Sequence, residues 1–281
     1  MTESALAPTR PILRYHGGKW VLAPWIISNF PLHRVYVEPF GGAGSVLLRK
    51  PRAYSEVYND LDGELVNLFR VARDKGAALA KALLLTPYAA AEFFESYTHS
   101  TDTVEQARRT VIRSLMGFGT NSHARKTGFR ANSTRSGTTP AHDFARYPDA
   151  LEAVIARLRG VVIENQAALT VMLKHDGPDT LHYLDPPYLP ETRSRPDADY
   201  RHEMTVRDHV DLAAAAKALT GMVVLSGYPS PLYTSLYHDW TLIQAPALAD
   251  GAAPRTECLW LSPAVTQRGI QTSLFEMDGL K

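Results

Sequence analysis

Residues 35–48 read VYVEPFGGAGSVLL, and this stretch says most about the architecture of the chain. It opens with β-branched and aromatic residues, continues with three glycines in four positions (Gly41, Gly42 and Gly44), and closes on an apolar run. A β-rich segment that ends in glycines and turns into a helix is typical of the first strand–helix unit of an open parallel sheet. Because glycine lets the backbone approach a ligand closely, we expect this turn to form one wall of a nucleotide-sized notch.

An acidic residue, Asp60, follows the glycine turn at the end of a second predicted strand, residues 56–60 (EVYND). It lies roughly 20 residues further along, the spacing expected for a side chain that accepts hydrogen bonds from both hydroxyls of a bound ribose. Taken alone, the same pattern is compatible with a tight turn beside a surface aspartate. A dinucleotide site is the other alternative, although the turn is not a GxGxxG match.

The rest of the chain alternates strand and helix patterns, apart from its middle. A helix is predicted at 64–73, and residues 76–120 look helical. Gly, Ser, Thr and Asn dominate residues 117–140, which predicts a loop. The fold class predicted is therefore α/β, a doubly wound Rossmann-like sheet with a mainly helical insertion. The remaining elements are predicted strands at 161–164, 180–185, 221–226 and 256–261, the last antiparallel or at an edge, and a helix at 206–219.

The tetrad Asp185, Pro186, Pro187 and Tyr188 ends an apolar predicted strand, where ligands bind in open α/β sheets. Two consecutive prolines delete two amide donors and leave the local carbonyls free. The Asp185 carboxylate and the Pro186 carbonyl can each accept one hydrogen of an adenine amino group, so that the nitrogen pyramidalises and aims its lone pair at a methyl donor. Tyr188 offers a flat face for a base taken out of its helix. A proline-rich turn without function is the alternative for the tetrad taken alone.

These motifs, in this order, resemble the DNA adenine methyltransferase family, and specifically its group with the order glycine motif, recognition insertion, tetrad. Residues 14–19 (RYHGGK) resemble the family's N-terminal cofactor motif, residues 38–45 (EPFGGAGS) its glycine motif, and residues 58–60 (YND) its ribose-binding strand. Residues 225–228 (LSGY) and 255–260 (RTECLW) resemble its later strands, especially in phage-type members. The resemblance covers nearly the whole chain.

The resemblance implies a Rossmann-like methyltransferase sheet and an N6-adenine-specific reaction that uses S-adenosyl-L-methionine. It implies a catalytic domain formed by residues 1–75 and 160–281, with target recognition in the inserted residues 76–159. Tyr15 stands where the family commonly has Trp, and Asn165 with Gln166 where it often has an Asp-Phe pair. The implied catalytic residues are Asp185, Pro186, Pro187 and Tyr188. The implied cofactor contacts are Tyr15, Gly18, Lys19, Glu38, Phe40, Gly41, Gly42, Gly44, Asp60, Asn165 and Asp185.

A basic span lies inside the predicted insertion. Between Ala107 and His142 the sequence has Arg or Lys at seven positions and no Asp or Glu. Such a local excess in a chain of net charge +1 is typical of phosphate contact and predicts double-stranded DNA as the partner. The alternative is an ordinary solvated loop. The residues are Arg108, Arg109, Arg113, Arg125, Lys126, Arg130 and Arg135, of which we expect Arg113, Arg125, Lys126, Arg130 and Arg135 to contact DNA.

Several other activities fit the motifs less well. Methylation of the cytosine amino group by the same fold tends to show Ser at the first tetrad position, where this chain has Asp185. Methylation of a cytosine ring carbon needs a nucleophilic Cys, but Cys258 follows Glu257 in a predicted strand. RNA adenine methylation stays open. A nicotinamide-dependent oxidoreductase would leave the tetrad unexplained, and a DNA-binding module without catalysis would leave the cofactor motifs unexplained.

Composition narrows the setting of the protein. With one cysteine, Cys258, the chain can form no internal disulfide and no cysteine-based zinc cluster, and no metal site is predicted. No secretory signal and no apolar run long enough to span a bilayer is visible, so we expect a soluble cytoplasmic protein that does not enter membranes. The motifs fill the chain, which suggests a methyltransferase without a nuclease domain, either part of a restriction–modification pair or an orphan. Protein partners are not indicated.

Overall fold

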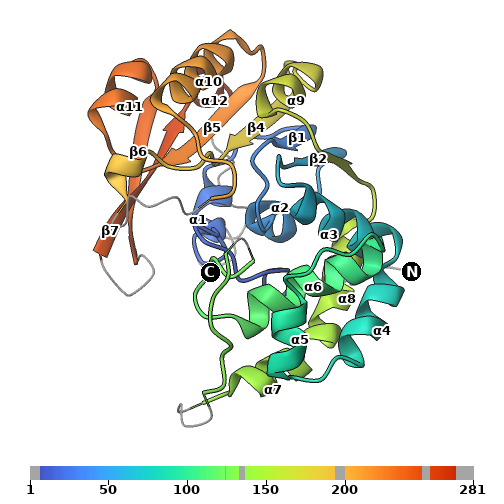
Figure 1. The fold of residues 1–281 in the computed structure, drawn as a ribbon. Coiled ribbons are helices and arrows are strands. Elements are labelled where there is room, and N and C mark those ends of the chain that lie inside the picture. Colours follow the sequence, from blue (N-terminus) through green and yellow to red (C-terminus); the bar gives the residue numbers. More distant parts are fainter. Residues whose placement is uncertain (1–6, 124, 133–136, 194–199, 249–253, 270–281) are drawn as a thin grey trace, which may run out of the picture.

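A seven-stranded sheet organises the protein (Figure 1). The computed structural model describes residues 7–123, 125–132, 137–193, 200–248 and 254–269. The strand order is β3-β2-β1-β4-β5-β7-β6, which confirms the predicted doubly wound α/β fold. The strands are β1 (Val35–Glu38), β2 (Ser55–Asn59), β3 (Val161–Glu164), β4 (Thr180–Leu184), β5 (Met222–Gly227), β6 (Thr241–Leu248) and β7 (Pro254–Leu261).

The direction in which the sheet is wound changes between β1 and β4. From β1 the chain proceeds outward to β2 and β3, and from β4 it proceeds the other way to β5, with all these pairs parallel. Ligands bind in such sheets where the winding reverses, outside the carboxyl ends of the strands. The glycine turn after β1 and the tetrad after β4 therefore meet at one edge of the sheet.

The strand predicted at 256–261 is antiparallel, as expected, but it does not lie at the edge of the sheet. It is β7, which pairs with β5 on one side and with β6 on the other. The sequence analysis predicted no strand at residues 241–248. These residues form β6, which pairs with β7 as a hairpin and occupies the edge of the sheet in its place.

Helices cover both faces of the sheet, and the strands alternate side chains between them. In β5, Met222 and Val224 join the core beneath one face, whereas Val223 and Leu225 join the core beneath the other. All six residues of β5 are buried, which explains the apolar run from Met222 to Leu225 that begins the strand. The helices are α1 (Ala23–Ser28), α2 (Ser45–Arg49), α3 (Gly63–Asp74), α4 (Gly76–Leu84), α5 (Ala90–Glu95), α6 (Thr103–Met116), α7 (Pro140–Ala145), α8 (Tyr147–Leu158), α9 (Ala168–Lys174), α10 (Val206–Ala218), α11 (Pro231–Leu236) and α12 (Pro263–Arg268), with a 3₁₀ turn η1 (Pro190–Thr192).

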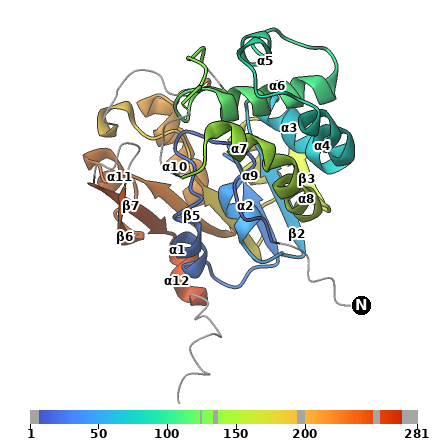
Figure 2. The ribbon, with the colours of Figure 1, turned by 90° about the horizontal axis from the view of Figure 1, so that it is seen from below.

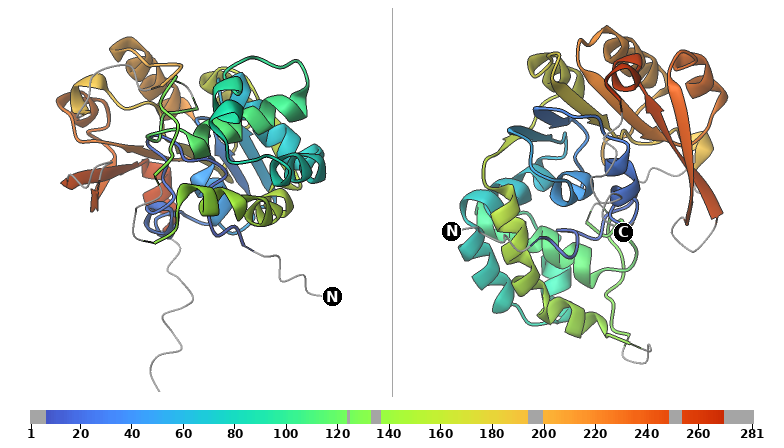
Figure 3. Two further views of the ribbon diagram at one scale, coloured as in Figure 1. Left: turned by 60° about the horizontal axis from the view of Figure 1, so that its bottom comes forward. Right: turned by 180° about the vertical axis from the view of Figure 1, so that it is seen from behind.

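Helices α4 to α8, between α3 and β3, form the region predicted as an insertion. They gather beside β2 and β3, at the opposite end of the sheet from β6 and β7 (Figures 1 and 2). Leu79 of α4 and Val111 of α6 belong to the same continuous core as Tyr58 of the sheet. Arg157 of α8 pairs with the buried Glu56 of β2 at 2.6 Å. The insertion is therefore packed onto the sheet, as the view from behind also shows (Figure 3).

The predicted loop lies between α6 and α7. Within the described residues it has no helix or extended strand, and one isolated antiparallel bridge joins Gly117 to Phe129. In the described part of the chain, no helix combines the length and apolar composition needed to cross a bilayer. Nor do three His, Cys, Asp or Glu side chains there come together as metal ligands would.

Candidate active site

A pocket of about 400 Å³ lies at the carboxyl ends of β1 and β4. Its volume falls within the range of small-molecule sites. It brings together residues from the N-terminal segment, the glycine turn, the end of β2 and the tetrad, as the winding of the sheet requires. The predicted site residues that line it are Tyr15, Gly18, Lys19, Glu38, Phe40, Gly41, Gly42, Asp60, Asp185 and Pro187.

The glycines of the turn are required by packing and by backbone conformation. Gly42 and Gly44 have φ of +49° and +62°, in the left-handed region that favours glycine. A Cβ on Gly41 would lie 2.1 Å from the ring of Tyr58, and one on Gly44 would lie 2.9 Å from the ring of Phe69. Gly41 and Gly42 line the pocket, while Gly44 caps the first turn of α2 without lining it.

Asp60 is fixed at the rim of the pocket by two backbone amides. Its Oδ2 accepts from Gly42 N and its Oδ1 from Asp62 N, both at 2.8 Å. Burial raises the pKa of the Asp60 carboxyl to about 6, although both amide hydrogen bonds favour the charged form. A carboxylate held in this way has its remaining lone pairs oriented in advance for further donors.

Glu38 lies beneath the turn at the end of β1 and is 2% exposed. Its Oε2 accepts hydrogen bonds from Tyr36 Oη at 2.7 Å and Leu47 N at 3.0 Å. Burial raises the pKa of the Glu38 carboxyl to about 8. Because this pKa leaves Glu38 largely protonated near pH 7, the anionic groups among the predicted site residues that line the pocket are Asp60 and Asp185.

Lys19 faces the tetrad more than the glycine turn. Its Nζ lies 3.0 Å from Asp185 Oδ1 and donates to Gly17 O at 2.8 Å. It also lies 4.6 Å from the centroid of the Tyr188 ring, over the face of that ring. Burial alone would lower the pKa of Lys19, but Asp185 and Glu257 outweigh burial and raise it. Lys19 is therefore a buried cation that neutralises the Asp185 carboxylate.

The ring of Tyr188 is covered and held from several directions. It is 7% exposed and does not line the pocket. Its Oη donates to Glu257 Oε2 at 3.0 Å, and its ring meets Tyr228 edge-on with centroids 4.7 Å apart. Arg193 donates to its carbonyl oxygen. Pro186 is likewise buried and outside the pocket lining, whereas Pro187 lines it.

Residues 200–204, which follow the tetrad in the sequence, also line the pocket, and the sequence analysis did not predict this. The hydroxyl of Tyr200 packs closely against Gly17: a Cβ added to this glycine would lie 2.4 Å from Tyr200 Oη. Arg201 pairs with Asp62 at 2.9 Å and with Glu64 at 3.4 Å, at the start of α3.

The polar residues that contact the site residues and were not predicted include three in distant parts of the chain. Ser226 of β5 donates to Asp185, Glu257 of β7 accepts from Tyr188, and His123 lies against Tyr15. A polar side chain inside an apolar strand, as in VVLSG and TECLWL, is a sequence signal that could have identified Ser226 and Glu257. No pattern in the loop identifies His123.

Asn165, an expected cofactor contact, points elsewhere in the structure. It is exposed, does not line the pocket, and its Nδ2 donates to Asp60 O at 2.8 Å and to Leu61 O at 3.2 Å. Its neighbours Gln166 and Ala167 line the pocket instead. Asn165 thus supports the backbone around Asp60 and does not face the pocket.

The structure corrects the expectation that Arg113 contacts DNA. It is 5% exposed and pairs with Glu64 of α3, so its guanidinium does not face a phosphate. Arg108 pairs with Glu92 and Glu105, both at 2.7 Å. Arg109 pairs with Glu105 in the same way. The acidic partners of these arginines, Glu64, Glu92 and Glu105, all precede residue 107, where the basic span without Asp or Glu begins.

Within the predicted basic span, the charge that remains exposed lies in the loop between α6 and α7. Arg125 and Lys126 are exposed. Arg130 is half-buried and donates to Leu115 O at 3.1 Å. Arg135 lies outside the described residues. Of the predicted DNA contacts, Arg125 and Lys126 are thus the most accessible in the described structure.

Comparison with known proteins agrees with this geometry. A family profile described as D12 class N6 adenine-specific DNA methyltransferase matches residues 15–247, which span the glycine turn, Asp60 and the tetrad. The Type II methyltransferase M1.LlaDCHI of Lactococcus lactis subsp. cremoris is 27% identical over 259 residues, covering 83% of this chain and 86% of that protein.

Proposed function

This chain belongs to the D12 class of N6 adenine-specific DNA methyltransferases, and from that membership we propose which of its residues bind, orient and react. The enzyme transfers a methyl group from S-adenosylmethionine to the N6 amino group of adenine in DNA. The assignment of individual residues rests on the pocket and its contacts.

The residues of the pocket fit S-adenosylmethionine. Asp60, fixed by two amides, is the acceptor for the ribose hydroxyls, and the tight glycine turn of Gly41 and Gly42 allows close approach of the cofactor. The carboxylates of Asp60 and Asp185 line the same pocket and favour a sulfonium cation there. When bound, the cofactor supplies an electrophilic methyl carbon, whose bond to sulfur breaks, with its electron pair going to sulfur, as the bond to adenine N6 forms.

The tetrad holds the target base. The Asp185 carboxylate and the Pro186 carbonyl accept the two amino hydrogens, which localises the nitrogen lone pair for in-line attack. After transfer the nitrogen loses one proton, for which the Asp185 carboxylate is the nearest base. Tyr188 provides the stacking face, and because Lys19 lies over that ring, the ammonium leaves the face when the base enters. Most of the rate enhancement then comes from positioning and fixed charge.

Residues 76–159 act in target recognition, and residues 1–75 with 160–281 form the catalytic part. Support for the DNA contact comes from the exposed Arg125 and Lys126 in the loop between α6 and α7. Arg130 and Arg135 extend the same basic loop in sequence. These cations bind phosphates, which fix the register of the enzyme on the duplex.

The single observation that carries the assignment is Asp185 at the carboxyl end of β4, lining the pocket it shares with Asp60. Asp185→Asn keeps the size of the side chain and removes its negative charge. Single-turnover methyl transfer to duplex DNA should fall on the order of 100- to 1,000-fold, the cost of one preorganised electrostatic contact. DNA binding should be unchanged.

The matched control is Glu191→Gln, which neutralises an exposed carboxylate shortly after the tetrad. It should methylate at the wild-type rate. Digestion of the product to nucleosides should give N6-methyladenine. A near-wild-type rate for Asp185→Asn would overturn the assignment of the tetrad, and methylated cytosine as the product would overturn the assignment of the reaction.

A further inference from the structure

The Asp185 side chain has two polar contacts in the described structure, and both are made by the same carboxylate oxygen, Oδ1. Oδ1 accepts from Ser226 Oγ at 2.6 Å and lies 3.0 Å from Lys19 Nζ. Among the residues that the structure describes, none donates a hydrogen bond to Oδ2. The carboxylate is therefore anchored through Oδ1, and Oδ2 is left for a further donor.

The two groups on Oδ1 differ in how firmly they are placed. Ser226 is 1% exposed and lies on β5, which is paired with β4 on one side and β7 on the other. Its hydroxyl accepts from Tyr183 Oη at 3.2 Å, which leaves its own proton for Asp185. Lys19 carries its ammonium on a flexible four-carbon stem.

Entry of the target base affects the two groups differently. The Lys19 ammonium lies 4.6 Å from the Tyr188 centroid, over the face on which the base is proposed to stack. It therefore has to move as the base enters. Ser226 is held by a central strand and has no such conflict, so its bond to Asp185 persists while the base is bound.

We propose that Ser226 is a positioning residue that holds Asp185 Oδ1 and thereby presents Oδ2 to the N6 amino group of the target adenine. This proposal rests on the proposed role of Asp185. Ser226 touches neither base nor cofactor and acts through the carboxylate. Without it, the carboxylate is free to rotate about its terminal bond once Lys19 has moved away. A rotated carboxylate no longer places an acceptor on the line of the amino hydrogen.

The first test is single-turnover methyl transfer by Ser226→Ala. The rate should fall about 10- to 100-fold, as expected for losing a hydrogen bond to a charged group. Affinities for S-adenosylmethionine and for DNA should stay within about 2-fold, because neither ligand contacts Ser226. The matched control is Tyr233→Phe, which also removes a buried hydroxyl hydrogen bond, the one between Tyr233 Oη and His209 Nδ1 at 3.0 Å, beside the end of β5. This control should react at the wild-type rate.

A double-mutant cycle separates positioning from general damage. In an Asp185→Asn background, Ser226→Ala should cost no more than about 2-fold, because the group through which Ser226 acts has been changed. If Ser226→Ala does not fold, Ser226→Cys, with a weakly donating thiol, takes its place in the same cycle. A wild-type rate for the Ser226 variant, or multiplicative losses in the cycle, would overturn the inference. A wild-type rate for Asp185→Asn alone would instead overturn the proposed role of the tetrad.

Discussion

The rings of Tyr15 and His123 lie against each other with centroids 4.7 Å apart and planes inclined by 31°. Tyr15 comes from the N-terminal cofactor motif, and His123 comes from the loop of the predicted recognition region. Both line the pocket, and His123 is 5% exposed. Burial lowers the pKa of the His123 imidazole to about 4, so the ring is neutral near pH 7. The loop that carries the basic residues is thus part of the pocket wall.

Removal of the His123 ring should weaken cofactor binding through the loss of support for Tyr15. His123→Ala leaves one face of Tyr15 unsupported, and a ring pair of this kind contributes about 0.5–1.5 kcal/mol. We expect about 2- to 10-fold weaker binding of S-adenosylmethionine by isothermal titration calorimetry. His142→Ala, in an exposed histidine of α7, is the control and should bind normally. Equal affinity for the His123 variant and the wild type would show that the loop does not support the pocket.

The affinity for S-adenosylmethionine should rise as pH increases through about 6. The pKa of the Asp60 carboxyl is raised by burial to about 6, so this group is largely protonated at pH 5 and ionised at pH 7. Only the ionised form accepts from two hydroxyls without losing an acceptor site to a proton. Binding at or below pH 6 should therefore release a proton.

Calorimetry in buffers of different ionisation enthalpy measures this proton release. Asp60→Asn should bind more weakly and should lose both the proton release and the rise in affinity between pH 5 and 7. The measurements stop at pH 7 because burial raises the pKa of Glu38 to about 8, and ionisation of Glu38 would add to the changes in affinity above pH 7. A wild-type affinity that does not change from pH 5 to 7 would contradict the role given to Asp60.

The sequence located the glycine turn and the tetrad in the fold because each is encoded by neighbouring residues. The glycine turn and the tetrad each follow a strand, and parallel winding alone brings the ends of β1 and β4 together. Arg113 was misjudged because its partner Glu64 lies 49 positions away, and no local pattern shows such a pairing. Asn165 was assigned from resemblance, whereas the turn after β3 directs it to the carbonyl of Asp60.

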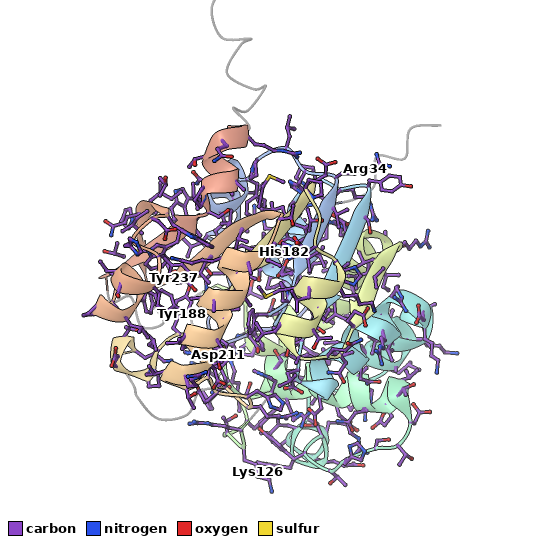
Figure 4. All side chains as sticks on the ribbon, turned by 90° about the horizontal axis from the view of Figure 1, so that it is seen from above. Arg34, Lys126, His182, Tyr188, Asp211 and Tyr237 are labelled. Carbon is purple, nitrogen blue, oxygen red and sulfur yellow. The ribbon has the colours of Figure 1, made fainter. Side chains whose placement is uncertain are left out.

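DNA binding should depend on Arg125 and Lys126 through their charge. Neutralising both with Gln should reduce the slope of log affinity against log salt concentration by about 0.9 for each phosphate that no longer meets a cation. The matched control is the pair Arg34 and Arg159, two exposed arginines just before β1 and β3, at the end of the sheet away from the pocket. Figure 4 shows Arg34 and Lys126 at opposite ends of the molecule. Fluorescence anisotropy over a salt series measures both slopes, and equal slopes for the two double variants would place the DNA on another surface.

Glu257 should matter for catalysis through the ring of Tyr188. It is 6% exposed on β7, and its Oε2 accepts from Tyr188 Oη at 3.0 Å. Burial raises the pKa of its carboxyl, and the nearby Lys19 ammonium opposes that rise. Glu257→Ala leaves a buried phenol without its acceptor, which costs roughly 1–3 kcal/mol when no replacement is found. The ring then has less to fix its orientation, and a base that stacks on it is held less well.

We therefore expect Glu257→Ala to lower the single-turnover rate about 10-fold and to give a smaller fluorescence rise with 2-aminopurine at the target position. Glu257→Gln keeps an acceptor oxygen and should lose less. Tyr188→Phe removes the other partner of the same bond, so it should resemble Glu257→Ala, and combining the two should add little. If Tyr188→Phe is fully active while Glu257→Ala is slow, Glu257 acts on the site by another route, through the charge it presents to Lys19.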